Sequence, residues 1–252
     1  MAIKLTTTRQ AARLNGVKIT VYGASGAGKT SLCATTGGSP LIISAESGLL
    51  SLRETDIPVI EVSSISEVIE AYQFVASSAE ARQFDWICLD SISEVAEVVL
   101  TAEKKATKDA RQAYGQLQEK MYDLIRAFRD LPKNVYFSAK QMAEKTDVME
   151  TRTTGAVTVQ AVVGSRVTYA PSLPGTKLGQ SLPYFTDMVL ALRVERDAEG
   201  QIHRWLQTQP DESYVAKDRS GSLLPFEEPN LAAIAAKINA TNSTGVNSNG
   251  LN

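Results

Sequence analysis

A phosphate-binding loop constrains the fold of this chain more than any other feature of its sequence. Residues 23–30 read Gly-Ala-Ser-Gly-Ala-Gly-Lys-Thr and satisfy the complete pattern G-x-x-x-x-G-K-[ST]. The β-rich run 17–22 stops at Gly23, and the segment after Gly28 has a composition that favours a helix. Strand, glycine-rich turn and helix are the context that the motif requires, so a chance glycine-rich turn is the weaker interpretation.

Each residue type in this loop has its own chemical use. The glycines allow backbone N–H groups to turn inward around phosphate oxygens, and the start of the following helix adds a favourable dipole. Lys29 is expected to reach the terminal phosphates, and Thr30 to offer its hydroxyl to a magnesium ion. We therefore expect ATP and Mg²⁺ as ligands, with the nucleotide held by Gly23, Ala24, Ser25, Gly26, Ala27, Gly28, Lys29, Thr30 and Ser31.

Apolar runs and amphipathic segments alternate along the chain, which predicts an α/β fold. The run 84–89 is almost continuously apolar apart from Asp85, as in a strand that is buried on both faces of a parallel sheet. We expect three α/β/α layers, a mainly parallel sheet and a C-terminal antiparallel hairpin. The expected strands are 17–22, 40–44, 58–62, 84–89 and 135–139, the hairpin is 188–194 with 202–208, and the helices are 112–131 and 66–79, the latter burying Val68, Ile69, Tyr72 and Val75.

The expected organisation is one core domain with polar ends. Residues 1–16 form a polar lead, 17–240 the core and 241–252 a disordered tail. Between 142 and 183 neither the helical nor the strand period holds for long, so we expect a long loop with a binding role.

Composition excludes several classes of protein. With 43% apolar and 21% charged residues the chain is not disordered overall, and no run of about eighteen apolar residues suits a membrane span. Its 26 basic and 28 acidic residues give a net charge of −2, so a nucleic-acid or lipid partner has to be met by a local patch. Cys33, Cys88 and His203 are too few ligands for a structural zinc site, and His203 suits an exposed strand. We expect a cytoplasmic protein without membrane contact.

A carboxylate at the end of a buried strand is the second element that a phosphate-binding loop needs, because it orders the magnesium shell. Asp90 ends the run 84–89 and is expected to act with Thr30 at the metal, the alternative being a cap of the next helix. Many phosphate-loop ATPases place a water-activating glutamate after this aspartate, and Ser91 stands here instead. Glu46 ends the second strand and is the candidate base, with a solvated loop glutamate as the alternative.

The pattern to this point resembles the RecA-type recombinase core. After the loop, one strand ends in Ser-Ala-Glu at 44–46 and a later strand ends in Leu-Asp-Ser at 89–91, in the order and spacing of that family. The resemblance implies a RecA-like P-loop NTPase core in which Glu46 is the catalytic glutamate and Lys29 assists it.

Two later segments resemble the same family. The run 135–141 looks like the strand that carries the family's nucleotide-sensing glutamine, which implies a catalytic role for Gln141. The family has an asparagine before that glutamine, whereas Lys140 stands here, so either residue could sense the γ-phosphate. Lys-Asp-Arg-Ser-Gly at 217–221 is similar to the Lys-Asn-Arg-Phe-Gly motif of RadA-like relatives. That motif implies that Lys217 and Arg219 act near a neighbouring subunit's nucleotide or near DNA; an ordinary basic turn is the alternative.

The resemblance spans about 17–229 and looks most like phage-encoded Sak-type single-strand annealing ATPases. RecA-type cores bind single-stranded DNA through two loops, after the magnesium-aspartate strand and after the sensor strand. Basic side chains there would neutralise phosphates, and a tyrosine could stack on a base. A solvated helix face is the alternative for the charged run 103–111. The candidates are Lys104, Lys105, Lys108 and Arg111 in the first loop, and Lys145, Arg152, Arg166, Tyr169 and Lys177 in the second.

Our first hypothesis is therefore a magnesium-dependent, DNA-stimulated ATPase that assembles as a homo-oligomer on single-stranded DNA, beside a single-stranded-DNA-binding protein, and promotes annealing or strand exchange. A second is a nucleotide-gated helicase loader or replisome accessory with little DNA contact. A small-molecule kinase is disfavoured because no arginine-rich lid is evident. The sequence lacks a helical lid after the hairpin, which argues against an AAA+ ATPase. Ring and filament assemblies both stay open.

Overall fold

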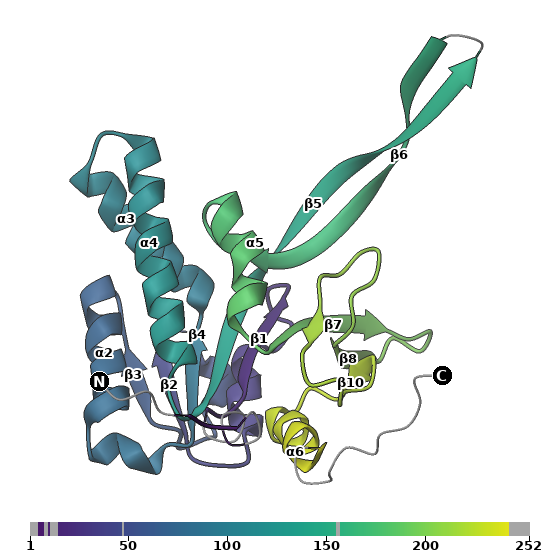
Figure 1. Cartoon of the computed structure of the whole chain (residues 1–252). Helices are drawn as coiled ribbons and strands as arrows, with labels where there is room; N and C mark the ends of the chain where they lie inside the picture. Colours follow the sequence, from purple (N-terminus) through teal and green to yellow (C-terminus); the bar gives the residue numbers. More distant parts are fainter. Residues whose placement is uncertain (1–4, 8–9, 11–14, 47, 155–156, 242–252) are drawn as a thin grey trace.

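The computed structural model describes residues 5–7, 10, 15–46, 48–154 and 157–241, without the side chains at 150–154, 157–163, 176 and 241. Strands and helices alternate over most of this length (Figure 1). The elements in chain order are β1 (Lys18–Gly23), η1 (Thr30–Thr35), β2 (Pro40–Ser44), η2 (Leu49–Leu52), β3 (Val59–Glu61), α2 (Ile65–Ser77), η3 (Glu80–Gln83), β4 (Trp86–Asp90), α3 (Ile92–Ala106), α4 (Ala110–Arg129), β5 (Asn134–Thr154), β6 (Val157–Ser172), α5 (Thr176–Phe185), β7 (Met188–Arg196), β8 (Ile202–Gln207), β9 (Lys217–Asp218), β10 (Phe226–Glu227) and α6 (Leu231–Thr241).

One sheet organises the molecule. Its strand order is β10-β8-β7-β1-β5-β4-β2-β3, with β6 paired to β5 and β9 to β7. The six strands from β3 to β7 along this order are parallel, and β8 returns antiparallel to β7 as the expected C-terminal hairpin. The predicted fold class is confirmed. Strand β5 lies between β1 and β4, so the loop after β1 faces Asp90 across one intervening strand.

Helices cover the two faces of the sheet unequally. Side chains of α2, α3, α4 and α5 pack with one face into a large core, while η1 and α6 pack with the opposite face into a smaller one (Figure 1). Strand alternation sorts the sheet residues between them: Leu89 and Phe137 enter the larger core, and Cys88 and Tyr136 the smaller. Ile69 departs from the prediction, since it is 44% exposed on the outer side of α2.

The expected long loop between 142 and 183 is wrong. Strands β5 and β6 continue past the sheet as a paired antiparallel arm, from Lys140 opposite Ser172 to Thr154 opposite Val157, and helix α5 follows (Figure 1). The strands of the arm could not be predicted from alternation of apolar and polar residues, because neither face of the arm packs against a core at 142–149. Side chains 142–149 are exposed on both faces of the arm, so apolar and polar residues need not alternate there.

The helix expected after the phosphate-binding loop is also different. It is the six-residue 3₁₀ helix η1, and no side chain caps its start. The chain after it reaches Gly37, whose φ is +68°, and Gly38, which together end the helical segment early. A helix this short adds little dipole, so phosphate binding has to come from the loop N–H groups and nearby side chains.

The polar ends are only partly described. Residues 1–4, 8–9 and 11–14 of the predicted lead and 242–252 of the predicted tail lie outside the described residues, while Thr241 ends α6. None of the helices in the described ranges is both long and apolar enough to cross a membrane.

Candidate active site

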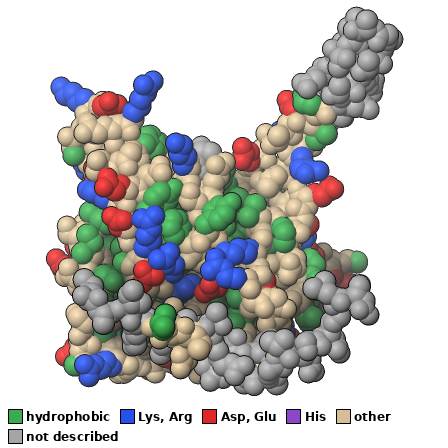
Figure 2. Space-filling view, viewed as in Figure 1, with side chains coloured by type: hydrophobic (Ala, Val, Ile, Leu, Met, Phe, Trp, Pro, Cys, Tyr) green, Lys and Arg blue, Asp and Glu red, His purple; other side chains and the backbone are tan. Residues whose placement is uncertain are grey.

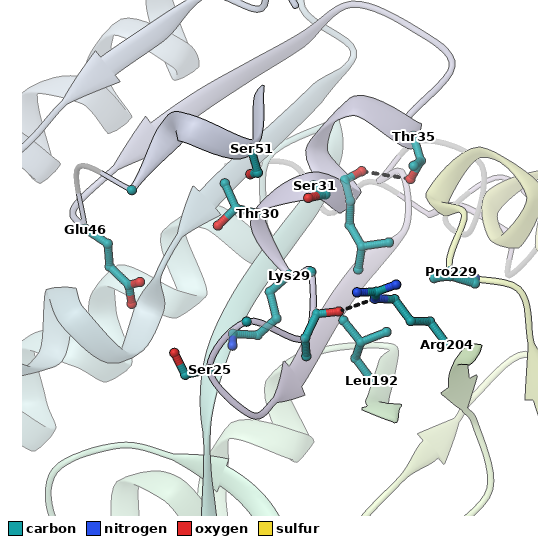
Figure 3. A pocket seen from close by; sticks show the side chains of 15 residues that line it. Ser25, Lys29, Thr30, Ser31, Thr35, Glu46, Ser51, Leu192, Arg204 and Pro229 are labelled. Carbon is teal, nitrogen blue, oxygen red and sulfur yellow. Dashed lines mark hydrogen bonds between the residues drawn. The ribbon is translucent and has the colours of Figure 1, made fainter. Parts of the chain in front are cut away.

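The phosphate-binding loop lies at the carboxyl end of β1 and lines a cavity of about 540 Å³ (Figure 3). Gly26 and Gly28 have φ angles of +74° and +110°, where any other side chain is strained, so the loop shape requires glycine at both. The Nζ atom of Lys29 donates to the carbonyl oxygens of Gly23 and Ala24, each at 2.9 Å. The lysine head is therefore held at the loop by neutral carbonyl partners that an anion can replace.

Electrostatics link Lys29 to both predicted acids. Burial lowers the pKa of Lys29, while the charges of Glu46 and Asp90 act in the opposite direction. Both carboxylates thus lie within electrostatic reach of the ammonium group. Residues from three separate segments, the loop and the ends of β2 and β4, come together as the sequence predicted.

Asp90 is held at the centre of a hydroxyl network. It is 3% exposed; its Oδ2 accepts from the Thr30 hydroxyl at 2.7 Å, and its Oδ1 accepts from the Ser138 hydroxyl. Ser44 lies beside Asp90 on the neighbouring strand, in register and on the same face of the sheet. Its buried Oγ has no hydrogen-bond partner among the described residues. The Ser44 hydroxyl is therefore available to bind a water molecule or another ligand beside Asp90.

The donor set fits a magnesium ion. Hydroxyl and carboxylate oxygens suit this hard cation, which keeps several waters and uses one or two carboxylates plus substrate phosphates. Within the described ranges, no three acidic, histidine or cysteine side chains cluster as a self-sufficient metal cage. A site formed by Thr30 and Asp90 together with nucleotide phosphates is the arrangement that these residues can support.

Glu46 is positioned by the residue that takes the place of the usual glutamate. The Ser91 hydroxyl donates to Oε1 of Glu46, and the same Oγ accepts from the backbone N–H of Glu94 at 3.2 Å. Ser91 is fully buried and caps the start of α3, so its hydroxyl is fixed. The sequence shows that a base is missing after Asp90, but not that Ser91 holds its replacement. Only the sheet order brings β2 beside β4.

Alternation along β5 separates the two candidate sensors. Lys140 shares a face with Ser138, and therefore with Asp90, whereas Gln141 points to the other face. The Nζ atom of Lys140 pairs with Oε2 of Glu94 at 2.5 Å, which raises the pKa of Lys140. The charge of Lys140 is also felt at Lys29. The nucleotide-sensing role of Gln141 stays a prediction, and Lys140 is the one of the two that lies near the loop.

The opposite end of the cavity contains residues that the sequence did not single out. Arg204 on β8 donates its Nε–H to the carbonyl oxygen of Ala27 at 3.0 Å, and Leu192 and Pro229 line the same end (Figure 3). No motif marks these positions. They reach the loop because β7 lies next to β1 and the hairpin folds β8 alongside.

The structure places Lys217 and Arg219 away from this loop. Strand β9 pairs with the start of β7, at the amino edge of the sheet. The Nζ atom of Lys217 donates to the carbonyl oxygens of Pro183 and Thr186 at 2.5 and 2.6 Å, and Arg219 pairs with Asp187 at 3.0 Å. The two residues do not meet the loop of their own chain, and a contact with another subunit's nucleotide stays a prediction.

The first group of predicted DNA-binding residues lies where α3 passes into α4. Lys104, Lys105, Lys108 and Arg111 are all exposed, and Figure 2 shows basic side chains at the tip of this helical pair. The Nζ atom of Lys104 lies 5.4 Å from the ring centroid of Tyr114. The segment is a helical corner and not an open loop.

The second group lies on the arm and on α5. Lys145, Arg166 and Lys177 are exposed, and Arg166 lies 3.8 Å from Glu212. Tyr169 is half-buried and stacks on Tyr214 with ring centroids 4.8 Å apart, so one face of its ring is already covered. Arg152 is in β5, but its side chain lies outside the described residues.

The phosphate-binding loop, the two acids beside it and the mainly parallel sheet together define a P-loop ATPase domain of α/β fold. The chain belongs to the AAA domain family, whose model matches residues 15–220. After β8, the one helix among the described residues is α6. The sequence argues against an AAA+ ATPase because no helical lid follows the hairpin, and the described residues after β8 contain no group of helices that could form one. The chain nevertheless matches a family whose name is AAA domain.

Two solved structures are similar to the chain at low identity. A KaiC-like protein from the hyperthermophilic archaeon Pyrococcus horikoshii OT3 shares 13% identity, with a TM-score of 0.44 over 76% of this chain and 77% of that one. The flagellar accessory protein FlaH from Methanocaldococcus jannaschii shares 12% identity, with a TM-score of 0.40 over 81% of this chain and 85% of that one. No curated protein matches the chain.

Proposed function

We propose that the chain hydrolyses ATP with magnesium to drive its binding to single-stranded DNA, as a Sak-type annealing or strand-exchange protein in the cytoplasm of a phage-infected cell. The observation that carries the catalytic part is the meeting of Thr30, Asp90, Ser91 and Glu46 at one sheet edge beside the loop. The DNA part rests on the elements that project from that same edge.

In the proposed reaction, Lys29 exchanges its carbonyl partners for terminal phosphate oxygens, and Thr30 and Asp90 hold the metal. Magnesium supplies charge neutralisation at the phosphates. Glu46, oriented by Ser91, accepts a hydrogen bond from the attacking water and takes its proton as the water oxygen bonds to the γ-phosphorus. The bond between that phosphorus and the β–γ bridging oxygen breaks at the same time, and ADP and inorganic phosphate leave. Lys140, which pairs with Glu94, exchanges that partner for the terminal phosphate in this proposal.

A continuous strand supports a link between the nucleotide and DNA. Strand β5 contributes Ser138 and Lys140 at the site and then runs directly into the arm, which carries Lys145. The α3–α4 corner is connected in the same way, because α3 begins at Ser91. Both elements project from the same side of the sheet (Figure 1). Each starts from a residue that contacts an acid of the site, since Ser138 contacts Asp90 and Ser91 contacts Glu46.

The charge pattern of the arm favours a second candidate, a loader or replisome accessory that binds protein more than DNA. Glu144 and Asp147 alternate with Lys145 on β5, and Arg166 is close to Glu212. A nearly neutral arm gains little from phosphate neutralisation.

Charge removal at the α3–α4 corner separates the two candidates. We expect substitution of Lys104, Lys105 and Lys108 by alanine to weaken single-stranded-DNA binding and to reduce the slope of log affinity against log salt by about 2. The matched control removes three exposed arginines elsewhere, Arg53, Arg82 and Arg196. Equal DNA binding and ATP hydrolysis in both triple variants would favour the accessory role.

The ATPase itself is tested with Lys29→Ala. Wild-type protein is expected to hydrolyse ATP faster with single-stranded DNA present and to form larger assemblies with a slowly hydrolysed analogue, as seen by negative-stain microscopy. The variant is expected to lose nucleotide binding and both responses. A wild-type chain without any ATP hydrolysis in the presence of DNA would refute the proposal.

A further inference from the structure

The nucleotide cavity has two chemically different ends. At one end are the acids and hydroxyls that suit a metal and the terminal phosphates, with Asp90 bonded to Thr30 and with Glu46 close by. At the other end are a guanidinium, Arg204, and the apolar side chains of Leu192 and Pro229 (Figure 3). A nucleoside triphosphate has the same polarity, with anionic oxygens at one end and a flat aromatic base at the other.

Arg204 is held in place by one hydrogen bond, but its charge is not paired with an acid among the described residues. Its Nε–H bonds the Ala27 carbonyl at 3.0 Å, and its stem passes over Gly28, where an added Cβ would lie 3.7 Å from Nε. Among the described residues Arg204 forms no ion pair, and its Nη atoms have no hydrogen-bond partner. A planar cation anchored by one edge leaves its faces and its outer edge available to a ligand.

The orientation of the bound nucleotide along the phosphate-binding loop determines which part of it contacts Arg204. Because Thr30 and Asp90 mark the metal end, the rest of the nucleotide has to extend from the loop toward the end that holds Arg204. Guanidinium planes stack on aromatic faces, and prolyl and leucyl side chains pack against them. A phosphate would be recognised there by charge alone, whereas the apolar neighbours favour a base.

We propose that Arg204, with Leu192 and Pro229, forms a nucleobase subsite in which the base of the bound nucleotide stacks on the guanidinium plane. This inference rests on the proposed nucleotide-binding function. It assigns base contacts to Leu192 and Arg204 on the β7–β8 hairpin and to Pro229 in the connection between β10 and α6, outside every motif of the sequence.

Calorimetric titration with ATP and with inorganic tripolyphosphate, which lacks a nucleoside, tests the subsite. For Arg204→Ala we expect the Kd of ATP to rise about tenfold and the Kd of tripolyphosphate to stay within about twofold. Arg204→Lys keeps the charge without the plane and is expected to bind ATP nearly as weakly as the alanine variant. Arg196→Ala, on the same hairpin but outside the cavity, is the matched control and should bind both ligands as wild type does.

The outcomes separate this inference from the function on which it rests. An equal loss for ATP and tripolyphosphate in Arg204→Ala would assign the residue to phosphate or to support of the loop, and would overturn the subsite. So would unchanged ATP binding. A wild-type chain that binds neither ligand would overturn nucleotide binding itself, and the subsite with it. Thermal melting of Arg204→Ala without ligand checks that the exposed substitution leaves the fold intact.

Discussion

Ser91→Ala tests whether the Ser91 hydroxyl positions Glu46 for catalysis. The substitution removes the hydroxyl that donates to Glu46 and that also caps α3 through the N–H of Glu94. A hydrogen bond to a charged acceptor contributes about 1.5–3 kcal/mol when buried, and exposure of Glu46 reduces this to about 1–2 kcal/mol. If the bond holds Glu46 in the reactive position, kcat should fall about 5- to 30-fold while the Kd of ATP hardly changes.

Loss of the helix cap has to be separated from this effect. Ser64 caps α2 in the same way, accepting from the N–H of Glu67 at 3.3 Å, and lies outside the cavity. We expect Ser64→Ala and Ser91→Ala each to lower the free energy of unfolding by about 1 kcal/mol in urea titrations. Single-turnover ATP hydrolysis is then compared between the two variants. An equal, small effect on kcat in both would show that Ser91 is only a cap.

Three further predictions follow from the same structure. Ser44→Ala should leave the unfolding free energy unchanged, because the Ser44 hydroxyl has no partner to lose, yet weaken magnesium-dependent ATP binding; a large loss of stability in urea would contradict this. Burial lowers the pKa of Lys18 to about 8, below its ordinary 10.5, so the folded state releases this proton first and stability should rise between pH 8 and 10.5, by up to about 3 kcal/mol, in wild type but not in Lys18→Met. The free energy of unfolding is measured in urea at both pH values for both proteins. An equal change with pH in wild type and in Lys18→Met would refute the burial argument. Replacing 145–167 by Asn-Gly should change the unfolding free energy by less than about 1 kcal/mol, since the described side chains of this part of the arm make few core contacts; cooperative loss of the fold in urea would show otherwise.

The parallel sheet could be predicted because its signals are local. Buried strands such as 84–89 are recognised from a continuous apolar run. The predicted helix 112–131 ends within a few residues of the end of α4, because Pro132, which follows it, cannot continue a helix. The arm could not be predicted in this way. A two-stranded ribbon that is solvated on both faces has no buried side to impose a period of two, so 142–172 looks like a loop.

The same distinction applies to the site. The loop residues and Asp90 were placed together by motif and strand position, and the structure brings Thr30 and Asp90 to 2.7 Å. The hydrogen bond from Ser91 to Glu46 and the contact of Arg204 with the phosphate-binding loop both depend on which strands are neighbours in the sheet. Patterns of residues along one sequence do not specify that order. Lys140 and Gln141 lie on opposite faces of β5, and only Lys140 is on the face of Asp90. Which face this is could not be predicted before the pairing of β5 with β1 and β4 was known.

The most direct test of the account is single-turnover ATP hydrolysis by Glu46→Gln. The amide keeps the shape of the side chain and its bond from Ser91 but cannot take a proton from water, so the rate should fall at least about a hundredfold with ATP affinity within about twofold of wild type. Glu61→Gln, at the exposed end of the adjacent strand β3, is the matched control and should hydrolyse ATP at the wild-type rate. Hydrolysis by Glu46→Gln at the rate of Glu61→Gln would show that another group activates the water.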